Sequence, residues 1–224
     1  MPHSEMTLFP GQPMRIYSVP DSITAHPEKW CVQIKKNGHR AVVRCDETGT
    51  VKMIGRHGDD HELTASKRHE WQWLTDVLKP PFVLDGELVG PRQAGTKNYV
   101  LWMFDIILLK GKSFERRPYL DRLYTLWAAN PGNVHVHGTH YSYEACSEKL
   151  RNVPGYPISW ASDLFRNILN PDGENEGLVF KRTDIPLAWH TRPGVEDPNQ
   201  LKLRMEKGGE SFEPDGEVPS DPAR

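Results

Sequence analysis

The sequence predicts an α+β fold in which antiparallel sheets are flanked by helices. Several strand-like segments follow one another without the regular strand–helix alternation of a parallel sheet. Two of them, 80–90 and 98–109, are long and largely apolar, as expected of central strands. The 224 residues are 37% hydrophobic and 26% charged, which is typical of a globular protein able to bury a core.

The first part of the chain predicts an irregular lead-in followed by a hairpin. Residues 1–28 are rich in proline and polar residues. Segments 30–35 and 40–45 alternate apolar and polar residues on either side of Asn37-Gly38. An Asn-Gly pair between two such runs predicts a tight β-hairpin turn with positive φ.

The remaining elements follow from hydrophobic spacing. Helical spacing predicts helices, and β-branched or alternating segments predict strands. The predicted helices are 64–78, 117–129, 142–152 and 159–169, and the predicted strands are 49–55, 80–90, 98–109, 177–182 and 199–205. Residues 206–224 are acidic and poor in large apolar residues, which predicts a disordered tail. The ordered domain is therefore expected over 29–205.

Composition also bears on location and partners. No apolar run reaches transmembrane length, and the N-terminus lacks a signal-peptide pattern. The three cysteines have no metal-type spacing and indicate a reducing compartment, so a cytoplasmic protein without a membrane partner is expected. A net charge of −2 argues only weakly against a nucleic-acid partner, because a near-neutral protein can carry a local basic groove.

Five short stretches carry charged or aromatic residues in a suggestive order. They are "KKNG" from Lys35, "DGEL" from Asp85, "MFDI" with Phe104, "EGLVFK" from Glu176, and "KLR" from Lys202. Each alone is more often a solvated strand end or a core aromatic than a functional site. In this order they resemble the motifs of the nucleotidyltransferase domain shared by ATP-dependent DNA ligases, RNA ligases and mRNA capping enzymes.

Two further segments make DNA ligase the most similar branch. "GRHGDD", with Arg56, resembles the arginine-containing segment after the first ligase motif, and "FDIILLKGKSFERRPYLDRLYTL" resembles the stretch after the aromatic strand. The resemblance implies an ATP-grasp-like adenylation domain, with antiparallel sheets and helices around a nucleotide cleft. It also implies an ATP-dependent ligase that seals nicks in DNA, with ATP and Mg²⁺ required.

The resemblance makes Lys35 the nucleophile that attacks the α-phosphate of ATP and forms a lysyl-AMP intermediate. Lys35 has the one-residue gap before Asn-Gly that the motif requires, whereas Lys36 does not, and strand alternation sends Lys36 to the other face. A free lysine has a pKa of ~10.4 and is protonated at neutral pH. Crowding by neighbouring cations and a metal is expected to disfavour the charged form.

The other roles implied by the resemblance divide into three groups. Arg56 is expected to bind the 5′-phosphate of the strand to be sealed, supported by Arg40. Glu87 and Glu176 are expected near Mg²⁺, with Glu87 also close to the ribose, and Phe104 is expected to stack on the base. The full nucleotide-binding set is Gln33, Ile34, Arg40, Glu87, Phe104, Lys181, Lys202 and Arg204.

Two departures from the family pattern affect these expectations. Asn37 stands where the first motif has aspartate, which keeps the turn but removes a negative charge. The roughly 20 residues after the last motif are too few for the OB-fold domain of larger relatives. The expected partners are therefore nicked double-stranded DNA or RNA ends and a separate OB-fold or other protein, with the chain itself a monomer.

Three alternatives stay open at the level of sequence. Gln33 replaces the glutamate found in many ligases, and its amide both donates and accepts, so ATP and GTP are both compatible. The same fold could serve an RNA ligase or an mRNA guanylyltransferase, or an inactive module that binds nucleic-acid ends. "HVHGTH" carries three histidines without a completing carboxylate or cysteine, which favours an exposed hairpin over a metal site.

Overall fold

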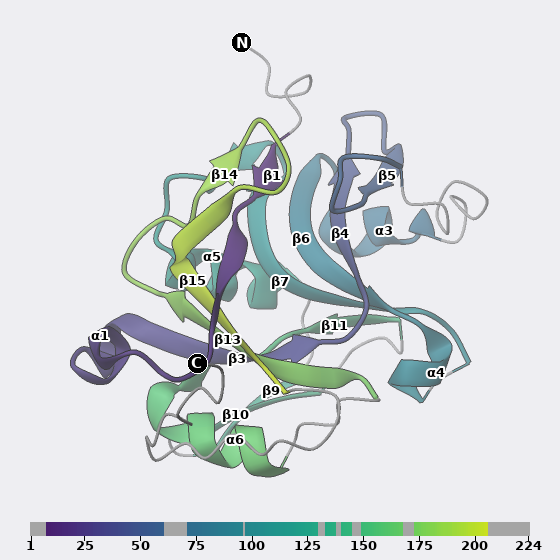
Figure 1. Cartoon of the computed structure of the whole chain (residues 1–224). Coiled ribbons are helices and arrows are strands. Elements are labelled where there is room, and N and C mark those ends of the chain that lie inside the picture. The colour runs from purple at the N-terminus through teal and green to yellow at the C-terminus, as the bar shows by residue number, and fades with distance from the viewer. Residues whose placement is uncertain are drawn as a thin grey trace, which may run out of the picture.

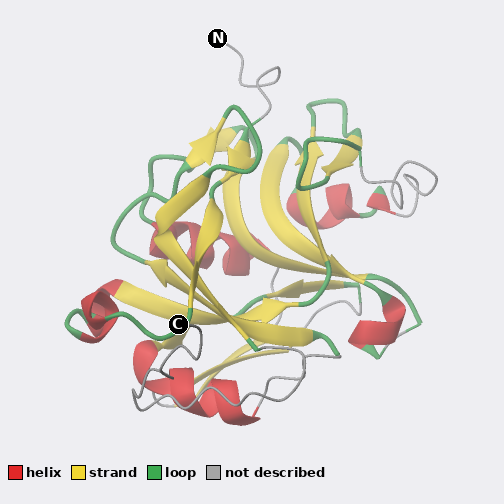
Figure 2. Cartoon of the chain, in the orientation of Figure 1, coloured by secondary structure: helices red, strands yellow, loops and turns green. Residues whose placement is uncertain are grey.

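The computed structural model describes residues 8–60, 71–95, 97–129, 133–137, 140–144, 149–167 and 173–205. Two sheets dominate it, as Figures 1 and 2 show. The first sheet has the order β11-β7-β6-β4-β5, with β8 paired to β7, and the second has the order β12-β3-β13-β15-β2. Most pairs are antiparallel, so the predicted α+β class is confirmed.

The bounds of the elements are as follows. The first sheet contains β4 (His39–Cys45), β5 (Val51–Ile54), β6 (Phe82–Val89), β7 (Val100–Leu109), β8 (Lys112–Ser113) and β11 (Leu150–Asn152). The second contains β2 (Gln12–Ile16), β3 (Trp30–Lys36), β12 (Tyr156–Pro157), β13 (Asn175–Arg182) and β15 (Glu196–Arg204). Two separate pairs are β1 (Phe9–Pro10) with β14 (Trp189–His190), and β9 (Asn133–His137) with β10 (His140–Glu144). The helices are α1 (Asp21–Thr24), α3 (Leu74–Leu78), α4 (Pro91–Ala94), α5 (Tyr119–Ala129) and α6 (Ala161–Asn167), with 3₁₀ turns at Pro27–Lys29 and Ile158–Trp160.

The predicted Asn-Gly hairpin is wrong, because β3 and β4 belong to different sheets. β3 pairs with β12 and β13, whereas β4 pairs with β5 and β6. The turn bonds to both sheets: the Asn37 N–H donates to the Glu174 carbonyl at 2.8 Å, and the Gly38 N–H donates to Glu87 Oε1 at 3.2 Å. Neither turn residue has positive φ. Asn37-Gly38 is thus a crossover between the sheets, and it places the end of β3 between them.

The crossover needs glycine at position 38 because the chain passes close to β6. A Cβ at Gly38 would lie 2.4 Å from the Leu88 carbonyl oxygen, which is backbone and cannot rotate away. We expect Gly38→Ala to lower the free energy of unfolding by about 1–3 kcal/mol, the range for an overpacked site. Urea denaturation followed by circular dichroism measures this change. Gly55→Ala is the control, because its Cβ would meet its nearest neighbour at 3.4 Å. Equal stability of the two variants would contradict this account of the turn.

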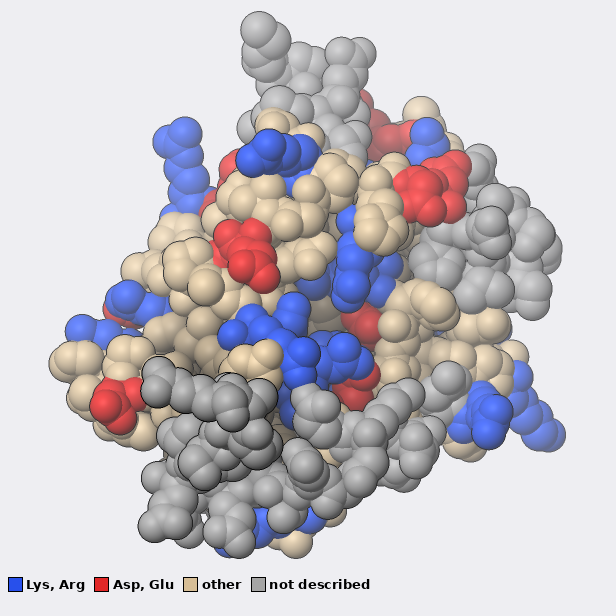
Figure 3. Space-filling model, in the orientation of Figure 1, with Lys and Arg blue, Asp and Glu red and all other residues tan. Residues whose placement is uncertain are grey.

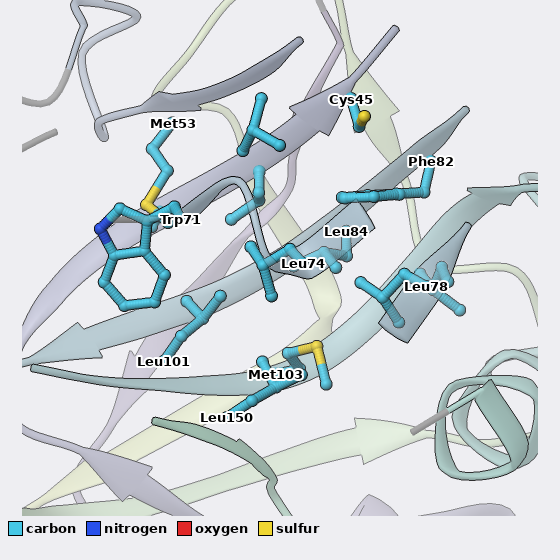
Figure 4. Packing of buried hydrophobic residues seen from close by; sticks show 14 of the residues in the cluster. Cys45, Met53, Trp71, Leu74, Leu78, Phe82, Leu84, Leu101, Met103 and Leu150 are labelled. Atoms are coloured by element: carbon cyan, nitrogen blue, oxygen red, sulfur yellow. The ribbon is translucent and has the colours of Figure 1, made fainter. Parts of the chain in front are cut away.

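Each sheet has its own core on the side away from the other sheet. Figure 4 shows the first core, in which Trp71, Leu74 and Leu78 pack on side chains of β4, β6 and β7. The second core joins Val32 and other apolar residues of β3, β13 and β15 to α1 and α6. Helix α5 contributes Leu126 to the first core, whereas its Tyr119 packs beside β3 in a smaller cluster. The facing sides of the two sheets form a cleft, except where Val42, Ile54 and Ile107 of the first sheet pack with Phe9 and Trp189 of the β1–β14 pair.

Two further predictions differ from the structure. The described part of the lead-in is not irregular, because it contains β1, β2 and α1, and β2 pairs in parallel with β15. The predicted helix 142–152 is also wrong where it is described: its ends lie in β10 and β11. Leu150 and Asn152 of β11 are buried beside β7, and this long-range pairing overrides the local helical spacing.

Other elements agree with the sequence. The remaining predicted strands and the helix at 117–129 are confirmed with small shifts of their ends, and the helix at 159–169 is confirmed over its described part. Helix 64–78 lies partly outside the described residues, and α3 forms its last part. No helix within the described ranges is long and apolar enough to cross a membrane.

Candidate active site

A cleft lies between the two sheets and is lined by residues of both. Figure 3 shows Lys and Arg side chains gathered at the centre of the face seen in that view, with acidic side chains beside them. The second sheet contributes Gln33, Lys35, Lys181 and Lys202, the first contributes Arg40, Glu87 and Phe104, and the loop after β5 contributes Arg56. The cleft therefore brings together most of the side chains singled out by the sequence.

Lys35 is held in the cleft by an ion pair with Glu176. Its ammonium group contacts Glu176 Oε1, and Arg204 contacts the other carboxylate oxygen. Glu176 is the unpaired residue of a β-bulge, since Asn175 pairs with Lys36 and Gly177 pairs with Lys35. A bulge turns a side chain out of the regular strand alternation, and here it faces Lys35. Burial disfavours the Glu176 carboxylate, but the charges of Lys35 and Arg204 outweigh burial and keep its pKa below the ordinary value.

Lys36 has a separate set of partners. Its ammonium group donates to Asn175 Oδ1 at 2.8 Å, lies 3.7 Å from Glu174 Oε2, and stands 3.6 Å from the centre of the Trp102 ring. The neighbouring lysines are thus held apart, and only Lys35 contacts Glu176. Burial lowers the pKa of Lys36 from the ordinary 10.5 to about 8.

The lowered pKa of Lys36 predicts a pH dependence of stability. Between about pH 8 and 10.5 the unfolded chain binds this proton and the folded chain does not, so the free energy of unfolding rises with pH across this window. We expect the rise to be smaller in Lys36→Met, by up to about 3 kcal/mol. Urea denaturation at several pH values measures the difference between the two proteins. The exposed Lys52→Met serves as control, and parallel pH curves for wild type and Lys36→Met would contradict the prediction.

On the opposite wall, Arg40 forms a buried bidentate ion pair with Asp85. Its Nε and Nη2 donate to the two carboxylate oxygens, and its guanidinium lies 5.1 Å from the centre of the Phe104 ring. Burial disfavours the charge of Arg40, but Asp85 more than compensates and raises the pKa of Arg40 above its ordinary value. Phe104 is also a bulge residue, because Asp85 pairs with Asp105 and Gly86 with Met103.

The remaining charges give the cleft an uneven field. Burial raises the pKa of Glu87 above its ordinary value, although the charges of Lys35 and Arg40 oppose this rise. Burial also lowers the pKa of Lys202, with further lowering from Arg56, Lys35 and Arg204. Crowded cations that lack a matching number of carboxylates favour binding of an anion such as a triphosphate.

One predicted nucleotide-binding residue does not face the cleft with its side chain. Ile34 borders the cleft, but its side chain belongs to the core shared with α1 and α6. Arg204 is half-exposed beside the cleft and acts on it through Glu176. The histidines of "HVHGTH" have side chains outside the described residues, although the backbone of β9 and β10 forms an antiparallel pair.

The structure also adds residues that the motif pattern missed. Gln200 lines the cleft and shares the strand alternation of Lys202 and Arg204, a signal that was available in the sequence. Gln12 reaches the cleft because β2 pairs with β15, which no local pattern indicates. Tyr119 lies behind Gln33 and contacts it through a hydrogen bond of 3.0 Å.

Comparisons with known proteins agree with this architecture. No model of a known protein family matches the sequence. A curated relative, the multifunctional non-homologous end joining protein LigD of Mycolicibacterium smegmatis, is 27% identical over 117 residues, covering 47% of this chain and 15% of that protein. The ligase domain of LigD from M. tuberculosis superposes with a TM-score of 0.58 at 21% identity, over 87% of this chain and 59% of the other. An archaeal ATP-dependent RNA ligase gives a TM-score of 0.54 at 20% identity, over 88% and 48%.

In this fold a lysine lies in a cleft between two mainly antiparallel sheets. More particularly, the chain has the fold of the adenylation domain of the ATP-dependent DNA and RNA ligase superfamily, as the motifs predicted. It spans less than two thirds of the length of each of these relatives.

Proposed function

We propose that this chain carries out the adenylyl-transfer chemistry of an ATP-dependent polynucleotide ligase, with a DNA nick as substrate. The observation that carries the proposal is the position of Lys35 in a basic cleft between two sheets, beside Glu176, Lys202 and Arg40. The similarity to the LigD proteins supports DNA over other substrates, and the motif order supports ATP as the nucleotide.

The first step requires Lys35 to become a free amine. In the resting cleft its ammonium group is paired with Glu176, and its proton passes to this carboxylate or to solvent before the attack. A triphosphate bound beside Lys202 and Arg204 pairs with these two cations through its phosphate oxygens. Arg204 then no longer holds Glu176. Lys35 then attacks the α-phosphorus of ATP, the bond to the β-phosphate breaks, and pyrophosphate leaves. The product is a lysyl-AMP phosphoramide.

Other residues of the cleft are proposed to hold the nucleotide and the nucleic acid. Phe104 presents its ring for stacking on the base, and Glu87 lies where it can accept hydrogen bonds from the ribose. The exposed Arg56 at the rim is suited to the 5′-phosphate at the nick. That phosphate displaces Lys35 from AMP, and the adjacent 3′-hydroxyl then displaces AMP to form the phosphodiester.

The carboxylates of the cleft fit an Mg²⁺ ion that is also bound by the phosphates of the nucleotide. Among the described residues no group of three or more His, Cys, Asp and Glu side chains is placed to hold a metal ion. Mg²⁺ commonly uses one or two carboxylates together with substrate phosphates, and Glu176 and Glu87 would supply these. Bound there, Mg²⁺ would neutralise charge on the phosphates.

The test is incubation of the purified chain with Mg²⁺ and either α-labelled ATP or α-labelled GTP. Denaturing gels and intact mass then report a covalent adduct. We expect an acid-labile label from ATP, and we expect the adduct to be consumed when DNA with a 5′-phosphorylated nick is added. No label from either nucleotide, combined with failure to seal a pre-adenylylated nick, would contradict the proposal and favour the end-binding module. A label from GTP alone would indicate guanylyl transfer.

RNA ligation is the second candidate, because an archaeal RNA ligase shares the fold to nearly the same extent as LigD. Matched nicks with ribose or deoxyribose on each side of the junction discriminate between the two substrates. Sealing that requires a 2′-hydroxyl would assign the chain to RNA.

A further inference from the structure

Strand β2 extends the cleft-facing side of the second sheet beyond the cleft itself. It lies beside β15 and pairs with it in parallel, with Arg15 opposite Lys202 and Ile16 opposite Leu203 (Figure 1). Paired residues of neighbouring strands lie on the same side of a sheet. Lys202 lines the cleft, whereas Leu203 and Ile16 pack in the second core, so Arg15 lies on the cleft side. The basic surface of the cleft therefore continues onto β2.

Tyr17 directly follows β2 and lies at the same level of the sheet as the proposed nucleophile. Lys35 of β3 pairs with Gly177 of β13, and Gly177 pairs with Arg204 of β15. Arg204 and Tyr17 each come one residue after the last pair of β15 with β2. Three spacings between strands thus separate Lys35 from Tyr17, which is roughly 14 Å across the sheet.

The ring of Tyr17 is exposed on one face and backed by a cation on the other. Tyr17 is 71% exposed, and the Arg15 guanidinium stands over its ring at 4.9 Å from the ring centre. A single exposed tyrosine needs no functional explanation by itself. This ring, however, is held by a cation at the basic side of the sheet, in line with the cleft. Exposed rings beside cations bind single-stranded nucleic acid, because bases stack on the ring and the cations neutralise phosphates.

A stacking ring requires a base with an open face. In a continuous duplex each base is covered by its neighbours, so an aromatic side chain reaches base faces mainly where bases are unpaired and splayed out. The phosphates of one DNA strand are 3.4 Å apart in the duplex and farther apart when the strand is stretched, so the distance from Lys35 corresponds to about two to four nucleotides.

We propose that Tyr17, backed by Arg15, stacks on an unpaired base a few nucleotides from the junction that is to be sealed. The inference rests on the proposed function in that it takes the reacting end to lie at Lys35. Pyrophosphate leaves before the nucleic acid reacts, so Lys202 and Arg204 are then available to backbone phosphates on the path to Tyr17. The chain therefore binds junctions with unpaired flanking bases more tightly than fully paired junctions.

Nicked DNA duplexes that differ only in base pairing test this contact. One is fully paired, and in the others the first few bases on the 5′-phosphate side or on the 3′-hydroxyl side are mismatched with the template. Fluorescence anisotropy without ATP measures their affinities. We expect the wild-type chain to prefer the mismatched duplex of one side. Tyr17→Ala should lose about tenfold in affinity for that duplex, the effect of one stacked base, and bind the paired duplex as before.

Matched variants separate stacking from a general loss of binding. Tyr17→Trp keeps an aromatic ring and should retain the preference for the mismatched duplex. Tyr124→Ala removes another exposed tyrosine, from α5, and should leave all affinities unchanged. Stacking releases no counterions, so the loss in Tyr17→Ala should be the same at low and high salt. Thermal melts followed by circular dichroism establish that each variant is folded.

The outcomes separate this inference from the proposed function. Three results would overturn the inference: a wild-type chain without preference for a mismatched duplex, an unchanged preference in Tyr17→Ala, or an equal loss for mismatched and paired duplexes. A wild-type chain that shows the Tyr17-dependent preference but forms no adduct with ATP and seals no pre-adenylylated nick would contradict the proposed function alone. An adduct with ATP in a chain without this preference would contradict the inference alone.

Discussion

Lys35→Ala is expected to abolish the covalent adduct with ATP, with labelling reduced to background. The reaction forms a bond to the side-chain nitrogen, so no neighbouring group can replace it without a new nucleophile in the same place. The nearest alternative, Lys36, is held by Asn175, Glu174 and the Trp102 ring, and it does not contact Glu176. Intact mass after incubation with ATP and Mg²⁺ measures the adduct directly.

Two lysine variants make this result specific. Lys35→Arg keeps a positive charge for the ion pair with Glu176, but an arginine side chain does not lose its proton in proteins. It should therefore fold normally and still form no adduct. Lys36→Arg keeps the charge beside Trp102 and should be labelled to within a few-fold of wild type. An adduct on Lys35→Arg, or its loss only in Lys36→Arg, would contradict the assignment of Lys35.

The chemistry-bearing strands could be predicted because their signals are local. Strand alternation places Gln33 and Lys35 on one side of β3, and the spacing of "DGEL" and "KLR" places Glu87 and Lys202 on strands that face the same cleft. These signals depend on residues two positions apart. They therefore do not depend on which strands pair with one another.

The arrangement of the sheets could not be predicted, because it depends on distant partners. An Asn-Gly turn between two alternating segments is compatible with a hairpin and equally with a crossover. The outcome is decided by the bonds of Asn37 and Gly38 to Glu174 and Glu87, which lie just before β13 and in β6. The parallel pairing of β2 with β15 is likewise a contact between the two ends of the described chain.

Two β-bulges turn side chains of the site in directions that the sequence motifs do not predict. Glu176 and Phe104 each occupy the extra position of a bulge, so the regular alternation of their strands does not give their directions. A sequence reveals that these residue types are present, but an extra residue in one strand is defined only against the partner strand. The expected cytoplasmic location, the monomeric state and the domain limits stay predictions.

The buried ion pair of Arg40 and Asp85 predicts the largest effect on stability. Asp85→Ala leaves the Arg40 guanidinium in a site where its side chain is only 15% exposed. Removing one partner of a buried pair costs about 3–5 kcal/mol, because the remaining charge is uncompensated. Urea denaturation at pH 7 measures this loss. The exposed pair of Arg182 and Asp184 is the matched control, and Asp184→Ala should cost less than about 1 kcal/mol.

A double-mutant cycle shows whether the penalty belongs to the charge or to lost packing. Arg40→Ala leaves Asp85 buried, so it too should be strongly destabilising, whereas Arg40→Ala combined with Asp85→Ala leaves neither charge behind. We therefore expect the double variant to be less destabilised than the sum of the single variants. Additive losses would mean that the pair contributes through packing of β4 on β6, and that Arg40 is held over Phe104 by the surrounding chain. A strong coupling would mean that the charge of Asp85 holds the Arg40 guanidinium at the cleft. Asp85 is placed to do this because its side chain is only 3% exposed and pairs with Arg40.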